Sequence, residues 1–238
     1  MLLENQTALV TGASRGIGRA IARALAGEGA RLVLVSRGAG RLEETASLCR
    51  ADGAEAVSVR SLDLADSGAV DNLCEELLSE GGVDILVNNA GAFVDGTALD
   101  GDPGEWERGL RLNVLVPMHL TRRLAPAMVE RERGTIINLG SVAAIEGMEA
   151  AGAYATTKHA LRGWSLSCYQ ALRRHGIKVV LINPGFVDTD MTAGVEGADR
   201  SRMLAPEDVA EAAMLGIRTR PACCPEEITL RLTKPPLG

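Results

Sequence analysis

A tyrosine and a lysine stand four residues apart at Tyr154 and Lys158, within Ala153-Tyr-Ala-Thr-Thr-Lys-His-Ala-Leu161. On a helix this spacing places both side chains on one face, so the phenol can lie beside the ammonium. A nearby cation lowers the pKa of an acid by about 1 to 3 units, starting from about 10 for a free phenol. The pair therefore predicts a group that exchanges protons near neutral pH. A half-buried tyrosine beside a solvated lysine would have the same spacing.

A glycine-rich turn follows the first apolar run, in Thr11-Gly-Ala-Ser-Arg-Gly-Ile-Gly18. Its three glycines permit a tight turn and a close approach of the backbone to a pyrophosphate, which the N-terminus of the following helix attracts. The spacing Gly-x3-Gly-x-Gly departs from the Gly-x-Gly-x-x-Gly fingerprint of many dinucleotide sites. Such turns also occur as simple tight connections, so the position between a strand and a helix is what favours a dinucleotide site.

The elements that must position these residues alternate along the chain. Strands are expected at residues 7–11, 31–35, 56–60, 84–87, 135–139, 178–182 and 228–232. Helices are expected at residues 17–25, 41–52, 67–80, 103–130, 153–174 and 206–217. This alternation predicts an α/β fold, a mainly parallel sheet with helices on both faces. Because no linker interrupts it, we predict one doubly wound domain over residues 1–238.

Polar and glycine residues stand at the ends of six consecutive predicted strands. They are Gly12, Ser36 with Arg37, Asp63, Asn88 to Gly91, Ser141, and Asn183 to Gly185. Turns alone would explain the glycines and the proline, but not the serines, the aspartate and the asparagines. Ligands of such sheets bind beyond the carboxyl ends of the strands, so we expect the functional site at this edge.

Several of these motifs together resemble those of the short-chain dehydrogenase/reductase family. They are the glycine loop, Asn88-Asn-Ala-Gly91, Ser141, Tyr154-x3-Lys158 and Pro184-Gly185. The match runs from about residue 6 to 232, in the family's order and spacing. The resemblance implies a seven-stranded Rossmann domain that binds a nicotinamide dinucleotide.

The resemblance also implies four catalytic residues. Tyr154 would exchange a proton with the substrate oxygen, and Ser141 would hydrogen-bond that oxygen as charge develops on it. Lys158 would lower the pKa of Tyr154 and bind the nicotinamide ribose, and Asn113 would hold a water that relays protons to the lysine. Judged by its own neighbours, Asn113 would be a surface residue that bends a helix, and Ser141 a strand-end cap.

The end of the second predicted strand indicates which nicotinamide cofactor binds. NAD sites usually place an acid there to hold the ribose 2′-hydroxyl, whereas a 2′-phosphate needs a nearby cation. Val33-Leu-Val-Ser-Arg37 has no acid; Ser36 can donate a hydrogen bond, and Arg37 can pair bidentately with phosphate. Arg15 in the glycine loop is a second candidate cation. We therefore predict NADP(H), the alternative being two solvated arginines.

The other expected cofactor contacts come from the family resemblance. Asp63 would bind the adenine, Asn89 and Gly91 would lie along the adenosine ribose, and Thr189 would hold the nicotinamide carboxamide. The polar side chains among them could instead be turns or caps. The full expected set is Gly12, Ser14, Arg15, Gly16, Ile17, Gly18, Ser36, Arg37, Asp63, Leu64, Asn89, Ala90, Gly91, Tyr154, Lys158, Pro184, Gly185, Val187 and Thr189.

By the same resemblance, the segments after strands four, five and six would contact the substrate. Residues 92–94, 142–148 and 190–204, the last within a substrate loop at about 188–205, are mostly apolar. The expected substrate is a neutral carbonyl compound or secondary alcohol. One alternative is reduction of 3-oxoacyl groups on acyl carrier protein, an acidic partner that favours a basic surface. An alternative of another class is a non-catalytic dinucleotide sensor.

Composition narrows the possible partners. The formal charge of −6 argues against nucleic acid or an anionic membrane as partner. With no transmembrane-length stretch and no leader expected, the predicted location is cytoplasmic. Five cysteines lack metal-ligand spacings, so free thiols and no metal are expected. The helices around residues 106–130 and 153–174 resemble the family's dimer bundle, which implies a homodimer or homotetramer.

Overall fold

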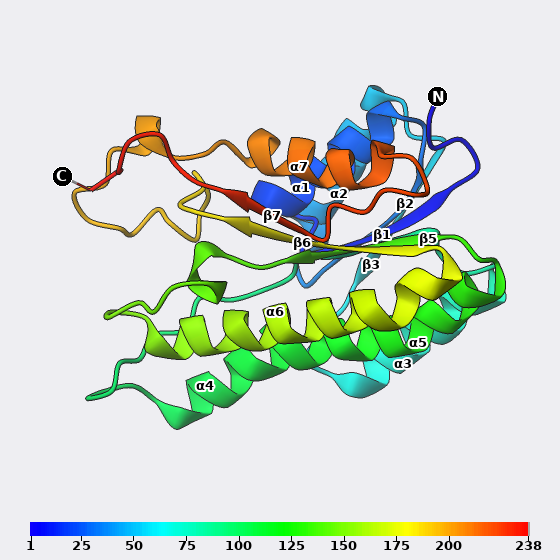
Figure 1. Cartoon of the computed structure of the whole chain (residues 1–238). Helices are drawn as coiled ribbons and strands as arrows, with labels where there is room; N and C mark the ends of the chain where they lie inside the picture. The colour runs from blue at the N-terminus through cyan, green and yellow to red at the C-terminus, as the bar shows by residue number, and fades with distance from the viewer. Residues whose placement is uncertain (238) are drawn as a thin grey trace.

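The computed structural model describes residues 1–237, in which one sheet is covered by helices on both faces (Figure 1). The sheet has seven parallel strands in the order β3-β2-β1-β4-β5-β6-β7. The strands are β1 (Thr7–Thr11), β2 (Arg31–Ser36), β3 (Ala56–Ser61), β4 (Ile85–Asn88), β5 (Gly134–Leu139), β6 (Ile177–Pro184) and β7 (Glu227–Leu230). The predicted α/β Rossmann fold class is confirmed.

The helices form two layers. One face carries α1 (Gly16–Gly27), α2 (Ala39–Asp52) and α7 (Pro206–Arg218) (Figure 1). The opposite face carries α3 (Ser67–Ser79), α4 (Pro103–Leu110), α5 (Val116–Glu130) and α6 (Gly152–Leu172). Short 3₁₀ turns lie at η2 (Val142–Ala144), η3 (Arg173–His175) and η4 (Arg200–Arg202). Both faces are covered because every crossover between parallel strands carries a helix across the sheet.

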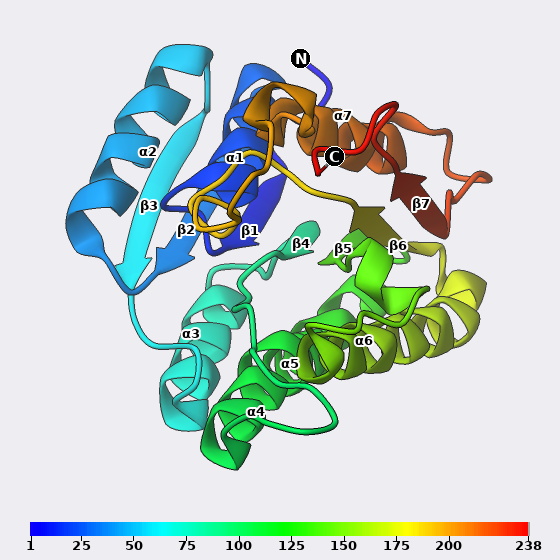
Figure 2. The ribbon, with the colours of Figure 1, turned by 90° about the vertical axis from the view of Figure 1, so that its left-hand side faces the viewer.

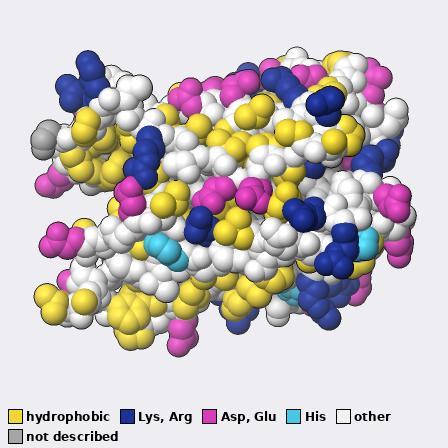
Figure 3. Space-filling view, in the orientation of Figure 1, with side chains coloured by type: hydrophobic (Ala, Val, Ile, Leu, Met, Phe, Trp, Pro, Cys, Tyr) yellow, Lys and Arg dark blue, Asp and Glu magenta, His cyan; other side chains and the backbone are white. Residues whose placement is uncertain are grey.

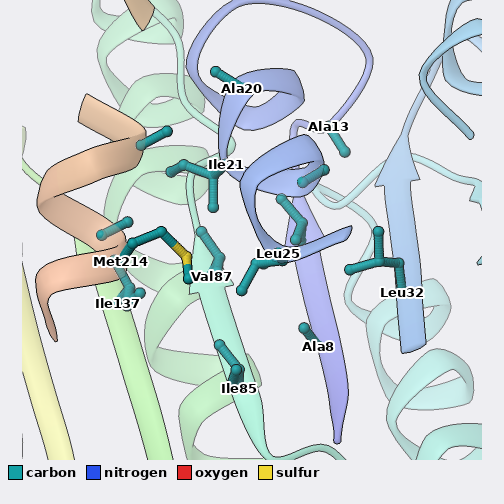
Figure 4. Packing of buried hydrophobic residues seen from close by; sticks show 14 of the residues in the cluster. Ala8, Ala13, Ala20, Ile21, Leu25, Leu32, Ile85, Val87, Ile137 and Met214 are labelled. Atoms are coloured by element: carbon teal, nitrogen blue, oxygen red, sulfur yellow. The ribbon is translucent and has the colours of Figure 1, made fainter. Parts of the chain in front are cut away.

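The apolar stripe of α1 packs the first layer onto the sheet. Ile21 and Leu25 of α1 and Met214 of α7 are fully buried beside Val87 and Ile137 of the sheet (Figure 4). Burying each such side chain contributes about 1.5 to 3 kcal/mol. This packing fixes the N-terminal end of α1, and with it the glycine loop, against the strand ends.

The helix predicted over residues 103–130 is interrupted. A π-helical turn, η1 (Arg111–Leu115), separates α4 from α5. Asn113 lies in this π-turn, and its expected surface position is wrong, because only 1% of Asn113 is exposed. A buried amide needs hydrogen-bond partners, and this one finds them in distant segments. π-turns of this kind are frequent at functional sites.

The strand ends also differ slightly from expectation. β6 continues through Asn183 to Pro184, because β7 pairs with it up to Pro184 opposite Leu230. β7 itself begins at Glu227 and ends at Leu230, before the predicted end of that strand. Asn183 is therefore a buried residue of the sheet rather than the start of a turn.

The loops at the carboxyl edge of the sheet lie together. Figure 2 views the side at the left of Figure 1, where the chain segments after β4, β5 and β6 surround the strand ends. The predicted substrate loop is closed at its base, where the Leu204 N–H donates to the Phe186 carbonyl at 2.9 Å. Its far part contacts the C-terminal tail, where the Asp199 N–H donates to the Pro236 carbonyl at 2.8 Å.

The surface and the thiols are unexceptional. Basic and acidic side chains are interspersed on the face shown in Figure 3. Among residues 1–237, no helix combines the length and apolar character needed to cross a membrane.

All five cysteines are free thiols, as expected, and burial raises the pKa of Cys49, Cys74 and Cys168 to about 11. The absence of nucleic-acid partners and the homo-oligomer stay predictions.

Candidate active site

A cavity of about 630 Å³ lies at the carboxyl edge of the sheet. All the residues expected to bind the cofactor line it, from the glycine loop at Gly12 to Thr189 of the substrate loop. Ser141, Tyr154 and Lys158 line it as well. Of the four expected catalytic residues, Asn113 alone lies behind the cavity wall.

Tyr154 and Lys158 lie one turn apart on α6. The Lys158 Nζ is 5.6 Å from the centre of the Tyr154 ring and donates a hydrogen bond to the Leu139 carbonyl oxygen at 2.8 Å. Only 6% of Lys158 is exposed, and burial lowers the pKa of its ammonium to about 8. The lysine is therefore fixed between α6 and the end of β5.

The lowered pKa expected for Tyr154 is wrong. Burial raises the pKa of Tyr154 to about 12, and the hydrogen-bonding Ser141 hydroxyl opposes this only in part. The loss of water around the phenolate outweighs the nearby lysine, whose own charge is disfavoured by burial. At neutral pH Tyr154 therefore holds its proton, as a general acid must.

The capping role expected for Ser141 is present, and its catalytic role stays a prediction that the geometry allows. Its Oγ accepts a hydrogen bond from the Ala143 N–H at 3.1 Å, which caps the short η2 helix. That bond uses a lone pair and leaves the single hydroxyl proton free to be donated. A serine that lines the cavity can thus cap η2 and also donate to Tyr154 or to a substrate oxygen.

Asn113 connects three segments behind the cavity. Its Nδ2 donates to the Ala92 carbonyl at 2.9 Å and to the Thr157 hydroxyl at 3.0 Å. Its Oδ1 accepts from the Ala92 N–H at 2.9 Å. Both amide protons are therefore occupied within the protein. The expected role of Asn113 in holding a relay water stays a prediction.

The glycine loop is shaped for close approach. Gly12 has a φ of +66°, in the left-handed region, and a Cβ on Gly18 would lie 2.3 Å from the Gly12 carbonyl oxygen. Asn89, expected along the adenosine ribose, donates from Nδ2 to the Thr11 and Gly12 carbonyls at 2.8 and 3.2 Å. Its side chain thus holds the turn in shape and leaves the backbone open to the cavity.

The end of β2 offers an incomplete hydrogen-bonding site. The Ser36 hydroxyl oxygen is buried and has no partner among residues 1–237. Arg37 is exposed beside it and makes no ion pair within those residues. An orphaned hydroxyl next to an unpaired guanidinium fits the 2′-phosphate of NADP(H).

Arg15, the second expected cation, is already paired. Its guanidinium forms an ion pair with the Asp190 carboxylate, and Arg41 lies 3.4 Å from the same carboxylate. This hydrogen bond to Arg15 and the two positive charges hold the pKa of Asp190 below its usual range. Since Asp190 belongs to the substrate loop, this ion pair joins the loop to the cation that the cofactor was expected to meet.

Asp63 and Thr189 also make local contacts. The Ala65 N–H donates to Asp63 Oδ1 at 2.9 Å, which is the turn that the sequence left open as an alternative. The Thr189 N–H donates to the Thr192 hydroxyl at 3.2 Å. Both side chains still line the cavity, so neither contact removes them from a cofactor site.

The family model described as short chain dehydrogenase matches residues 6–199. The chain belongs to the short-chain dehydrogenase/reductase family. This short-chain dehydrogenase is 31% identical to an uncharacterized oxidoreductase of Staphylococcus saprophyticus over 230 residues, covering 96% of this chain and 98% of the relative. The chain is an oxidoreductase of this family.

Solved structures of other proteins resemble the chain throughout. A metagenomic short-chain oxidoreductase in complex with NADP superposes with a TM-score of 0.85 at 33% identity, covering 98% of this chain and 100% of that one. An alcohol dehydrogenase from the archaeon Thermococcus sibiricus, complexed with 5-hydroxy-NADP, gives 0.87 at 28% identity, covering 96% and 97%.

Three buried polar residues of this short-chain dehydrogenase were absent from the expected catalytic and cofactor-binding sets. The Thr11 hydroxyl accepts from the Asn89 N–H and the Ala90 N–H at 3.0 Å each, joining β1 to the segment after β4. Thr157 accepts from Asn113, and the Asn183 Oδ1 accepts from the Ser141 N–H at 3.2 Å. Thr11 and Asn183 were marked in the sequence only by their positions at the ends of strands, and Thr157 only by its position next to Lys158.

Proposed function

We propose that this protein is an NADP(H)-dependent oxidoreductase that transfers a hydride between nicotinamide and a carbonyl or secondary alcohol, with Tyr154 as acid and base. One observation carries the proposal. The hydroxyls of Ser141 and Tyr154 and the buried ammonium of Lys158 line the same cavity as the glycine loop. A proton donor and a dinucleotide cradle in one cavity are what carbonyl reduction requires.

The residues of the chain would divide the chemistry as follows. When bound, the nicotinamide supplies or accepts the hydride. Tyr154 would give its phenolic proton to the substrate oxygen during reduction and take it back during oxidation. Ser141 would donate a hydrogen bond to that oxygen as negative charge develops. The raised pKa of Tyr154, about 12, keeps the phenol protonated at neutral pH and so supports reduction.

The preference for NADP(H) rests on the end of β2. Ser36 has an unpartnered buried oxygen, Arg37 has no ion pair within residues 1–237, and no acid stands in Val33-Leu-Val-Ser-Arg37. A carboxylate there would repel a 2′-phosphate, whereas a guanidinium can bind it in a fork geometry. The structurally similar proteins with NADP and 5-hydroxy-NADP bound support the same choice.

The substrate end of the cavity favours a neutral compound. Its lining includes the apolar side chains of Phe93, Met148 and Phe186, and the Phe93 ring lies 5.1 Å from the Tyr154 ring. Two of the acids near this end are paired within the protein, whereas Asp95 also lines the cavity and forms no ion pair within residues 1–237. Glu146 accepts from Arg231 at 2.5 Å, and Asp190 pairs with Arg15. A mostly apolar pocket whose unpaired charge at this end is negative suits a modest-sized ketone better than an anion.

A substrate panel with a matched tyrosine variant tests the proposal. NADPH oxidation would be followed with ketones, diketones, hydroxy acids, small 3-oxoacyl thioesters and 3-oxoacyl groups on acyl carrier protein. We expect turnover with at least one small carbonyl compound, and a loss of about 10²- to 10⁴-fold in Tyr154→Phe with NADPH affinity retained. Unchanged turnover in Tyr154→Phe would refute the mechanism.

Two other outcomes would replace the proposal. NADPH binding without turnover of any compound would indicate the dinucleotide sensor. Turnover confined to the acyl carrier protein substrate, with none of the matching small thioester, would indicate the 3-oxoacyl reductase. Tyr169→Phe is the matched control, because Tyr169 is the only other tyrosine of the chain and does not line the cavity.

A further inference from the structure

We propose that Glu227 and Arg162 are positioning residues for Ser141, acting through the side chain of Asn183. The inference rests on the proposed function, since Ser141 matters to the reaction only if it meets the substrate oxygen. None of these three residues belongs to the glycine loop or to the set of residues that line the cavity. Together they form a hydrogen-bonded chain from β7 and α6 to the backbone of Ser141.

The hydrogen-bonded chain starts where the backbone hydrogen bonds between β5 and β6 end. The Gly140 N–H still donates to a backbone carbonyl, that of Ile182, at 2.8 Å. The next N–H, that of Ser141, donates instead to the Asn183 side-chain Oδ1 at 3.2 Å. An asparagine side chain thus extends the ladder by one residue, at the serine that is expected to meet the substrate.

Glu227 decides which way the Asn183 amide faces. Asn183 is fully buried, and its Nδ2 donates to Glu227 Oε1 at 2.7 Å. Rotating the amide by a half turn would place its NH₂ group against the Ser141 N–H and its oxygen against the carboxylate. Both contacts would be repulsive, and a buried amide has no water to compensate. The carboxylate therefore selects the orientation that presents an acceptor to Ser141.

Arg162 holds Glu227 in place. Its Nε and Nη2 donate to Glu227 Oε1 and Oε2 at 2.7 and 3.0 Å. The exposed fractions of the Arg162 and Glu227 side chains are 38% and 20%. Such a fork fixes direction as well as distance. Arg162 lies on α6, one turn after Lys158 and two turns after Tyr154. The hydrogen-bonded chain therefore connects α6, the helix that carries Tyr154, to the backbone of Ser141.

Close packing leaves little room for the amide to move. A Cβ at Gly140 would lie 2.1 Å from the Asn183 Oδ1. The amide is therefore pressed against the backbone immediately before Ser141. A change in its orientation would displace the serine and its hydroxyl. A misplacement of about 1 Å in a reacting group can cost on the order of 100-fold in rate.

Glu227→Ala is the direct test, and Glu227→Gln is the conservative variant. We expect Glu227→Ala to lower kcat for carbonyl reduction by about 10- to 100-fold while NADPH affinity stays within about threefold. The apparent acid pKa in its pH–rate profile should rise, because the Ser141 hydroxyl lowers the Tyr154 pKa. Glu227→Gln keeps an acceptor for the Asn183 amide and should retain most activity and the original profile.

Glu76→Ala is the matched control. It breaks a comparable ion pair between Arg60 of β3 and Glu76 of α3, away from the cavity. A general loss of sheet-to-helix anchoring would affect both alanine variants alike, whereas positioning of Ser141 would shift the pH profile of Glu227→Ala alone. Should Glu227→Ala fail to fold, Arg162→Met is expected to shift the profile in the same direction by a smaller amount.

Amide hydrogen exchange at Ser141 gives a readout that needs neither cofactor nor turnover. We expect the Ser141 N–H to exchange at least about tenfold faster in Glu227→Ala than in the wild type, Glu227→Gln or Glu76→Ala. Unchanged exchange at Ser141 together with an unchanged pH profile would overturn the positioning role. If the wild type reduced no carbonyl compound, the proposed function would fail. The exchange experiment would still decide whether the hydrogen-bonded chain fixes the backbone of Ser141.

Discussion

The side-chain amide of Asn113 donates to the hydroxyl of Thr157 at 3.0 Å, which ties the π-turn between α4 and α5 to the residue before Lys158. The same amide brackets the Ala92 backbone with two further hydrogen bonds of 2.9 Å. One buried side chain thus links the segment after β4, the π-turn and the helix that carries Tyr154. The link reaches α6 at the residue next to Lys158.

Removal of the Asn113 amide should lower the stability of the protein. In Asn113→Leu, the shape is roughly kept while the Ala92 backbone groups and the Thr157 hydroxyl lose their partner. We expect the free energy of unfolding to fall by about 2 to 4 kcal/mol, measured by chemical denaturation, because buried polar groups are left unsatisfied. The exposed Asn72→Leu on α3 is the control and should change stability by less than about 0.5 kcal/mol. Equal effects in the two variants would contradict the linking role.

Arg37 should determine the preference between the two cofactors. In Arg37→Ala, we expect NADPH to bind about 10- to 100-fold more weakly, since a charge-assisted hydrogen-bonded contact to phosphate is lost. NADH has no 2′-phosphate, so its affinity should stay unchanged. Dissociation constants from fluorescence titration would test this, with the exposed Arg220→Ala as a control for net charge. A variant that kept both affinities would exclude the phosphate contact.

Asp190 should compete with the cofactor phosphate for Arg15. In Asp190→Asn the ion pairs with Arg15 and Arg41 are lost, and the guanidinium of Arg15 becomes available to the cavity. We expect NADPH to bind up to about fivefold more tightly at low salt, with a smaller gain at high salt, because exposed ion pairs are weak and screened. Weaker NADPH binding in Asp190→Asn would show that the loop contact assists the cofactor instead.

Lys158 should make stability depend on pH in the alkaline range. Its folded-state pKa, about 8, lies below the ordinary value of 10.5, so between these values the unfolded chain binds the extra proton. Stability contributed by this group therefore rises with pH from about 8 to about 10.5. Lys158→Met should be more stable than the wild type near pH 7, by up to about 3 kcal/mol. This advantage should shrink as the pH approaches 10. A constant difference across this range would contradict the lowered pKa.

The features that depend on local spacing were predictable from the sequence. The fold class followed from the alternation of strand-like and helical runs, because side-chain periodicity reports how each segment is buried. Tyr154 and Lys158 lie on one face of α6 because a four-residue spacing fixes that on any helix. The glycine loop was evident for the same reason, since its strained backbone must be encoded by its own residues.

Contacts between distant segments, and the charge states that they set, were decided only by the tertiary structure. The burial of Asn113 was not evident from its neighbours in the sequence, because the partners of its amide, Ala92 and Thr157, lie 21 and 44 positions away in the chain. Arg15 is occupied by Asp190, which lies 175 positions away. Burial raises the Tyr154 pKa, and the extent of that burial is set by the assembled cavity rather than by the local sequence. The sequence by itself determined which groups could move a proton, and the packing around them determined which form each group holds.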